Sequence, residues 1–102
     1  MQKLYFVYIL YSNEYNKYYV GYSSNPLRRL EEHNKGIFNT FTSKYRPWIQ
    51  VAIFDCGEKK NDAIHLERFI KKQKNTRFII NLINNDFKPA GLLSQLIKRR
   101  VL

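Results

Sequence analysis

The sequence predicts an α/β fold of the α+β type, in which a small three-stranded, mostly antiparallel sheet is flanked by helices in the order ββαβαα(α). Two extended segments joined by a short polar turn open the chain, and amphipathic segments with recognisable helix caps follow. The length of 102 residues, with 44% hydrophobic and 25% charged residues, is typical of one globular domain over residues 1–102. We assign the core motifs to residues 4–73 and C-terminal helices to residues 76–100.

The first two elements are predicted to form a β-hairpin. Residues 3–11 are an almost unbroken apolar run, which is typical of a strand covered on both faces. Residues 12–16 are polar and form a turn, and residues 17–22 form the second strand. Gly21 interrupts that strand, which indicates either a bulge or the close approach of another group to the backbone.

The next element is a helix with clear signals at both ends. Asn25 is a suitable N-cap, Pro26 occupies the first helical position and Gly36 ends the helix. Arg29 and His33 are four residues apart, so they share one face of this helix.

The middle of the chain is expected to run from a loop through a strand into a second helix. Residues 37–48 are predicted to form an exposed loop, and residues 49–54 a third strand. The loop's polar and turn-forming residues are Thr40, Thr42, Ser43, Lys44, Arg46 and Pro47. The second helix is capped at Asn61 or Asp62 and ends near Gln73. Its apolar stripe consists of Ala63, Leu66, Phe69 and Ile70.

Two shorter helices are predicted at the C-terminal end. The first covers residues 77–84, with Phe78, Ile79, Leu82 and Ile83 facing inward. The apolar positions of the second are Leu92, Leu93, Leu96 and Ile97. It ends in residues 98–100, whose three cations suit the carboxyl end of a helix.

Charge and composition narrow the class of function. The net charge is +10, which favours a polyanionic partner and, for an intracellular domain, nucleic acid. A lone Cys56 excludes an internal disulfide framework and a cysteine-based zinc finger, and it suits a reducing compartment. The first residues do not resemble a signal peptide, and no apolar stretch reaches the ~20 residues of a membrane helix. We therefore expect a soluble, cytoplasmic protein.

Five residues are candidates for chemistry, and each also has an ordinary structural interpretation. Tyr8 and Tyr19 stand on paired strands, where two phenols can move a proton near a cation or pack over the core edge. Arg29 and His33 can bind a phosphate or form a solvated helix face. Glu67 can hold Mg²⁺ or pair with the lysine four residues later.

The order and spacing of these residues carry more information than any of them alone. Phe6-Val7-Tyr8 is followed, ten residues later, by Tyr19-Val20-Gly21. Together with segments 22–34, 41–48 and 62–71, this pattern resembles the GIY-YIG nuclease family. It is most similar to the small single-domain bacterial subgroup related to the N-terminal nuclease module of UvrC. The first motif lacks the glycine and isoleucine of the family pattern but keeps its tyrosine.

The resemblance implies a role for each of the five positions. Tyr8 and Tyr19 match the two motif tyrosines, one of which helps to deprotonate or position the attacking water, and Arg29 matches the arginine that steadies the phosphate. His33 falls where the family often has a histidine or tyrosine beside the active site. Glu67 matches the metal-binding glutamate, which implies Mg²⁺ or Mn²⁺ as the cofactor. A late active-site asparagine is not identified among Asn81, Asn84 and Asn85.

The function implied is a metal-dependent DNA endonuclease, hydrolysing phosphodiester bonds in DNA repair or processing. Its substrate would be single-stranded, branched or damaged DNA, with a protein partner as a further option. The residues expected to contact the DNA backbone are Lys44, Arg46, Lys71, Lys72, Lys74 and Arg77. One alternative is a nucleic-acid-binding module of the same fold that is non-catalytic or depends on a partner for cleavage. Another is a basic interaction protein without a nucleic-acid role.

Overall fold

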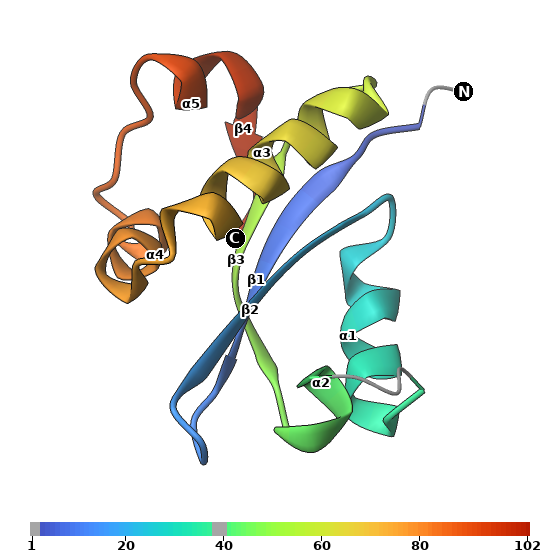
Figure 1. Cartoon of the computed structure of the whole chain (residues 1–102). Coiled ribbons are helices and arrows are strands. Elements are labelled where there is room, and N and C mark those ends of the chain that lie inside the picture. The colour runs from blue at the N-terminus through green and yellow to red at the C-terminus, as the bar shows by residue number, and fades with distance from the viewer. Residues whose placement is uncertain (1–2, 38–40) are drawn as a thin grey trace.

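A four-stranded antiparallel sheet with helices on both faces forms the centre of the protein (Figure 1). The computed structural model describes residues 3–37 and 41–102. The elements follow in the order β1 (Phe6–Ser12), β2 (Lys17–Ser23), α1 (Pro26–Lys35), α2 (Phe41–Lys44), β3 (Ile49–Asp55), α3 (Lys60–Gln73), α4 (Thr76–Ile83), α5 (Leu92–Leu96) and β4 (Arg99–Arg100). The strand order is β2-β1-β3-β4, so the predicted class and hairpin are confirmed, whereas the expected count of three strands was wrong.

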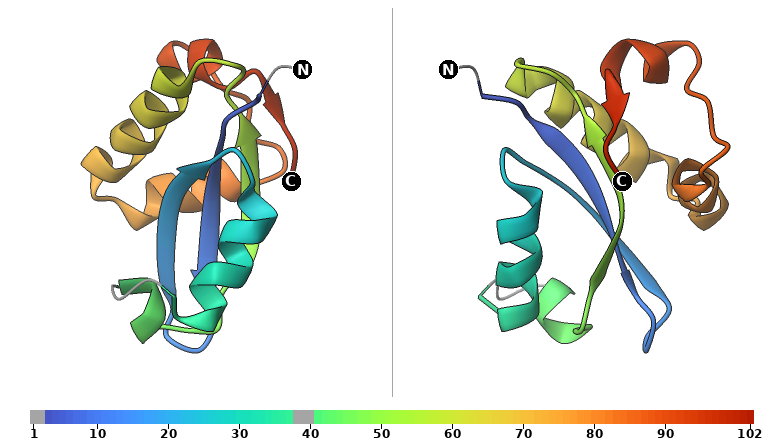
Figure 2. Two further views of the ribbon diagram at one scale, coloured as in Figure 1. Left: turned by 90° about the vertical axis from the view of Figure 1, so that its right-hand side faces the viewer. Right: turned by 180° about the vertical axis from the view of Figure 1, so that it is seen from behind.

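The strand β1 is covered on both faces, as its unbroken apolar run predicted. Val7, Tyr8, Ile9 and Leu10 are all 0% exposed. Val7 and Ile9 pack into the larger core below α3, α4 and α5, while Tyr8 and Leu10 point to the opposite side. Helices α1 and α2 lie on that second side (Figure 2). The alternation of side chains along β1 thus divides the core into two layers.

The first helix begins and ends where its cap residues predicted. The Asn25 side chain accepts a hydrogen bond from the backbone N–H of Arg28, and Gly36 adopts the left-handed conformation with φ of 73°. The start of α3 was predicted wrongly. Its N-cap is Lys59, which makes no side-chain cap bond, and Asp62 lies inside the first turn. There the acidic side chain still interacts favourably with the positive, N-terminal end of the helix dipole.

The predicted last helix through residues 98–100 was wrong. Helix α5 ends at Leu96, and the chain then pairs with β3 as β4. The backbone N–H of Lys98 donates to the carbonyl oxygen of Asp55 at 2.7 Å, and Arg99 forms an ion pair with the Asp55 carboxylate at 3.4 Å. The Arg100 guanidinium donates to backbone carbonyls at the end of α4. Partners far away in sequence therefore override a helical pattern that is locally sound.

Residues 37–48 were predicted to form an exposed loop, and this was wrong for part of the segment. Its described residues include the short helix α2, Thr42 at 0% exposure and Trp48 at 2% exposure. The Trp48 indole N–H donates to the Thr42 carbonyl at 2.8 Å. The Asn34 side chain holds the Trp48 backbone N–H and carbonyl at 2.6 and 2.9 Å. Thr40 lies outside the described residues.

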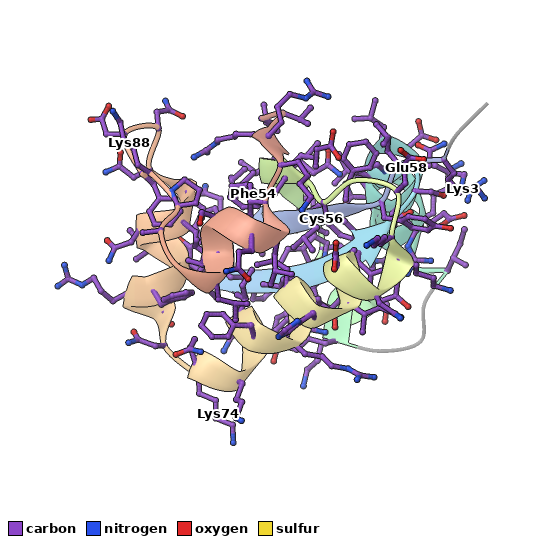
Figure 3. The ribbon with its side chains drawn as sticks, turned by 90° about the horizontal axis from the view of Figure 1, so that it is seen from above. Lys3, Phe54, Cys56, Glu58, Lys74 and Lys88 are labelled. Carbon is purple, nitrogen blue, oxygen red and sulfur yellow. The ribbon has the colours of Figure 1, made fainter. Side chains whose placement is uncertain are left out.

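Apolar and charged side chains separate as the composition leads one to expect. Phe54 and Cys56 belong to the larger core, whereas Lys74 and Lys88 project outward (Figure 3). Burial raises the pKa of the Cys56 thiol to about 12, so this residue is a protonated, apolar packing group rather than a nucleophile. Within the described part of the chain, no helix combines the length and apolar character that crossing a membrane requires.

Candidate active site

Side chains from β2, α1 and α3 meet around a pocket of about 280 Å³ at the outer edge of the sheet. It is lined by Tyr19, Gly21, Tyr22, Ser23, Arg28, Arg29 and Glu67. Because β2 is the outer strand, Glu67 on α3 can reach past it to the side that carries α1. Tyr19, Arg29 and Glu67 thus border one space, and Tyr8 and His33 lie directly behind them. The structure brings together all five residues predicted from the sequence.

The hairpin places the two tyrosines over a glycine. Tyr8 is opposite Gly21 in the β1–β2 register, and the ring centroids of Tyr8 and Tyr19 are 6.4 Å apart. A Cβ atom at Gly21 would lie 2.5 Å from the Tyr8 hydroxyl oxygen and 3.1 Å from Cε2 of Tyr19. Of the two interpretations of Gly21, close approach is therefore confirmed. The irregularity in the sheet lies elsewhere, between Ile9 and Leu10 where β1 pairs with β3.

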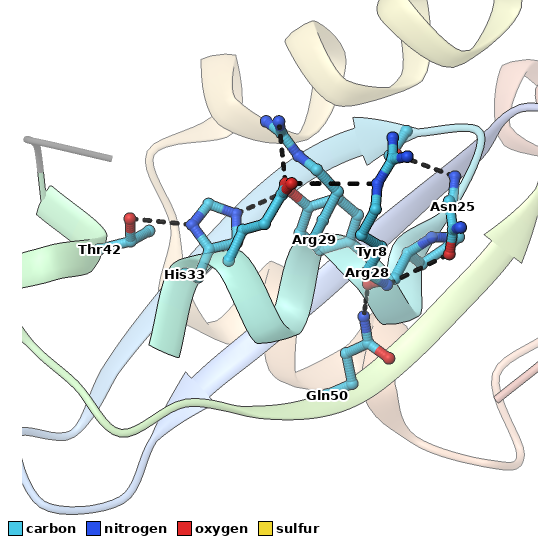
Figure 4. A network of polar contacts seen from close by, with 10 residues as sticks. Tyr8, Asn25, Arg28, Arg29, His33, Thr42 and Gln50 are labelled. Atoms are coloured by element: carbon cyan, nitrogen blue, oxygen red, sulfur yellow. Dashed lines mark hydrogen bonds and ion pairs between the residues drawn. The ribbon is translucent and has the colours of Figure 1, made fainter. Parts of the chain in front are cut away.

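A chain of hydrogen bonds fixes Tyr8 behind the pocket (Figure 4). Its hydroxyl lies 2.9 Å from His33 Nε2, and His33 Nδ1 lies 2.9 Å from the Thr42 hydroxyl. The Arg29 guanidinium lies near enough to the Tyr8 hydroxyl to lower the pKa of that phenol against the larger effect of burial. A neutral imidazole has one donor nitrogen and one acceptor nitrogen, so the hydroxyls of Tyr8 and Thr42 take opposite roles toward His33.

The protonation states agree with that arrangement. Burial raises the pKa of Tyr8 to about 12 and also raises the pKa of Tyr19, to which the Glu67 carboxylate contributes. Burial, followed by the positive charge of Arg29, lowers the pKa of His33 to about 4. At neutral pH both phenols are protonated and the imidazole is neutral. Neither tyrosine is therefore a phenolate base without help from a cation.

Of the two neighbouring arginines, Arg29 is the better placed. Its side chain is 32% exposed, against 64% for Arg28, and its positive charge acts on the pKa values of Tyr8 and His33. The Arg29 Nη1 atom lies 3.8 Å from the Glu32 carboxylate, which helps to orient the guanidinium at the pocket wall. The assignment of Arg29 as the match to the family arginine agrees with this geometry.

Glu67 forms the expected ion pair with Lys71 and also lies beside the pocket. Its carboxylate lies 3.7 Å from Lys71 Nζ, and the side chain also borders the pocket with 16% exposure. Glu67 contributes the only carboxylate among the described residues that line this pocket. Mg²⁺ keeps most of its water and often takes one or two protein oxygens, so this donor set fits a hydrated divalent cation. Across residues 3–37 and 41–102, no three His, Cys, Asp or Glu side chains are grouped as a closed metal site would need.

The six predicted DNA-contacting cations fall into three places. Lys71 lies at the active-site pocket, with Nζ 5.3 Å from the Tyr19 ring centroid. Lys44 and Arg46 border a second pocket of about 370 Å³ together with Tyr15. The other three are exposed around the junction of α3 and α4: Lys72, Lys74 and Arg77.

Thr42 is a functional-site residue that the sequence did not indicate. It was assigned to an exposed loop, yet its hydroxyl contacts His33 and its carbonyl accepts from Trp48. The one signal that could have revealed it is a tryptophan a few residues later, since a large aromatic side chain is unusual in a solvated loop.

Comparison with known proteins places this geometry in a family. The profile of the GIY-YIG catalytic domain matches residues 4–84. A UPF0213 protein of Listeria welshimeri is 39% identical over 67 residues, which covers 66% of this chain and 72% of that protein. A UPF0213 protein of Pediococcus pentosaceus is 31% identical over 77 residues, covering 76% of this chain and 80% of that protein.

A longer relative bears a functional name. The structure-specific endonuclease subunit SLX1 of Meyerozyma guilliermondii is 32% identical over 80 residues. The match covers 74% of this chain but 27% of that protein. The shared region therefore corresponds to one part of that endonuclease subunit. The five residues gathered around the pocket all lie within residues 4–84, which match the GIY-YIG profile. With the tyrosine pair, arginine, histidine and glutamate assembled at one edge of the sheet, this chain belongs to the GIY-YIG family.

Proposed function

We propose that this protein is a divalent-metal-dependent endonuclease that hydrolyses phosphodiester bonds of DNA during repair or processing. The observation that carries the proposal is the convergence of Tyr19, Arg29 and Glu67 on one pocket. Tyr8 and His33 support it from behind through hydrogen bonds that join Tyr8 to His33 and His33 to Thr42. Membership of the GIY-YIG family and similarity to a structure-specific endonuclease subunit support the same reaction class. The buried free cysteine suits the cytoplasmic setting that we also propose.

Each residue has a distinct part in the proposed reaction. Arg29 binds the scissile phosphate and stabilises the negative charge that grows on it in the transition state. Tyr19 borders the pocket and can contact the attacking water, while Tyr8 packs beside Tyr19 and is held in place by its hydrogen bond with the neutral His33. Glu67 would hold Mg²⁺ or Mn²⁺, which when bound supplies Lewis-acid stabilisation of the leaving oxygen.

The decisive experiment compares cleavage by two active-site variants and a matched control. Labelled single-stranded, duplex, flap and branched DNA are incubated with Mg²⁺ or Mn²⁺ and each purified protein. We expect Glu67→Gln and Arg29→Ala to lose cleavage while keeping the wild-type circular dichroism spectrum. Glu31→Gln removes an exposed carboxylate of α1 that does not line the pocket, and it should cleave normally. Undiminished cleavage by either active-site variant would refute the assignment.

The second candidate function is a DNA-binding module that cuts only with a partner. The observation in its favour is that the SLX1 relative is named as a subunit of an endonuclease. Binding without turnover on every DNA form and with both metals would select this alternative. In both cases we propose that DNA-backbone contacts come from Lys44, Arg46, Lys71, Lys72, Lys74 and Arg77. Affinity should therefore fall as salt rises.

A further inference from the structure

Four aromatic rings form a row that leads from the active-site pocket toward the tip of the β1–β2 hairpin. The ring centroids of Tyr19 and Phe41 are 6.5 Å apart with planes at 24°, which is a stacked arrangement. Phe41 is 4.7 Å from Tyr45, and Tyr45 is 5.3 Å from Tyr15. Helix α2 and the hairpin turn lie at the same end of the sheet (Figures 1 and 2). We call these four residues the aromatic row.

The four side chains of the aromatic row are not simply buried core residues. Tyr15 is 47% exposed and Phe41 is 42% exposed, and Tyr19 and Tyr45 are half-buried. The buried side chains beneath them already form a core cluster that includes Trp48. Packing therefore accounts for the inner edges of the rings, and it leaves their outer surfaces open to a ligand.

Cations accompany the row along its length. Lys17 Nζ and Lys44 Nζ each lie 5.5 Å from the Tyr45 ring centroid, and Lys71 Nζ lies 5.3 Å from that of Tyr19. Tyr15 and Lys44 also border the second pocket, to which Arg46 contributes. Exposed rings interleaved with lysines are the arrangement with which proteins bind single-stranded nucleic acid, because bases stack on the rings while phosphates meet the cations.

We propose that the aromatic row binds an unpaired DNA strand adjacent to the phosphodiester in the active-site pocket. The planes of successive rings are tilted against each other by 24°, 57° and 66°. Bases that stack on successive rings must tilt with them and lose the parallel stacking of a duplex, as only an unpaired strand allows. Beyond Tyr19 the row has room for about three nucleotides, one for each ring. This inference deepens the proposed nuclease function by naming its substrate as DNA with an unpaired segment.

Binding without divalent metal tests the inference separately from cleavage. Fluorescence anisotropy gives the affinity of the full chain for a blunt duplex and for the same duplex with a thymidine overhang. We expect the overhang to strengthen binding by wild type, and Tyr15→Ala and Tyr45→Ala each to remove on the order of tenfold of that gain. Tyr15→Phe and Tyr45→Phe keep a stacking ring and should keep the gain. A 2-aminopurine in the overhang should lose fluorescence on binding to wild type but less to the alanine variants.

The matched control is Tyr11→Ala. Tyr11 pairs with Tyr18 on the same hairpin, with centroids 4.8 Å apart, but it belongs to the alternating set that faces away from the row. It should bind the overhang as wild type does. Should Tyr45→Ala fail to fold, the highly exposed Tyr15 provides the same test without disturbing the core.

The outcomes separate this inference from the proposed nuclease function. An overhang that does not strengthen wild-type binding, or an equal loss in Tyr11→Ala, overturns the role of the row. If cleavage depends on Glu67 but is equally fast on blunt duplex, the proposed nuclease function stands and the proposed role of the aromatic row is wrong. Ring-dependent overhang binding without any cleavage supports the row and counts against the nuclease.

Discussion

Replacing Gly21 with alanine should damage both the fold and the active site, because this glycine lies directly under the Tyr8 ring. The added methyl carbon would sit 2.5 Å from the Tyr8 hydroxyl oxygen and 2.6 Å from its Cζ. Unstrained contacts between such atoms are about 3.5 Å, so the ring must move by about 1 Å. Tyr8 is 0% exposed and its hydroxyl is hydrogen-bonded to His33, which leaves the ring little room to move.

Two terms add to the expected loss of stability. Overpacking a close-packed core costs about 1–3 kcal/mol. Displacing the Tyr8 hydroxyl from His33, which is itself 2% exposed, costs about 1–3 kcal/mol more because two buried polar groups lose their partner. The free energy of unfolding should therefore fall by about 2–6 kcal/mol in urea titrations followed by far-ultraviolet circular dichroism. Cleavage should fall by about a hundredfold, since a displaced Tyr8 ring shifts its neighbours Tyr19 and Arg29 at the pocket.

Gly91→Ala provides the contrast. Gly91 has a φ of 59°, and an added Cβ there would meet nothing within 4 Å. This substitution should cost roughly 1–2 kcal/mol through backbone strain alone and leave cleavage unchanged. Ordinary surface substitutions change the free energy of unfolding by about 0.5 kcal/mol or less. If the free energy of unfolding of Gly21→Ala lies within that range of the wild-type value, the steric argument is wrong. If it cleaves no worse than Gly91→Ala, the positioning role of Tyr8 is wrong.

Three further predictions concern stability. The pKa of His33 in the folded protein is about 4, below its ordinary value of 6.5, so the unfolded chain binds this proton more readily. The stability that this group contributes is therefore complete above pH 6.5 and is lost as pH falls toward 4, by on the order of 3 kcal/mol. Urea titrations across that window should show the loss in wild type, and an unchanged profile in His33→Gln would contradict it. Asn34→Ala removes both bonds to the Trp48 backbone and should lower the free energy of unfolding by about 2 kcal/mol, with Asn34→Asp, which keeps the acceptor, intermediate. Arg100→Ala removes the donor to three carbonyls at the end of α4 and should speed backbone amide hydrogen exchange there. Arg100→Lys should restore little of the protection, because an ammonium lacks the guanidinium fork. Wild-type exchange rates in the alanine variant would refute this role.

Local features determined the hairpin and the first helix. The apolar run of β1, the polar turn after it, and the cap residues Asn25 and Gly36 all act through neighbours along the chain. Such signals can be recognised in the sequence because the groups that satisfy each other are only a few residues apart. The same holds for the Arg29–His33 pair, whose spacing put both side chains on one helix face.

The fourth strand and the buried part of residues 37–48 depended on distant partners. The segment that became β4 has apolar and basic residues in a helical order, but Asp55 and the carbonyls that end α4 offer its backbone and arginines better partners. Thr42 and Trp48 lie in a segment that is mostly polar, and they are buried because His33 and Asn34 bind them. No local pattern encodes those contacts.

The candidate site shows the same division. Order and spacing were sufficient to select Tyr8, Tyr19, Arg29, His33 and Glu67, because they are read along the chain. Which of them border the pocket was decided by the tertiary structure alone. Tyr8 and His33 lie behind it because the sheet buries one and α2 covers the other, while Glu67 reaches it because β2 has no further strand outside it. Sequence thus specified the chemical groups, and packing around the edge of the sheet set their exposure, protonation and direction.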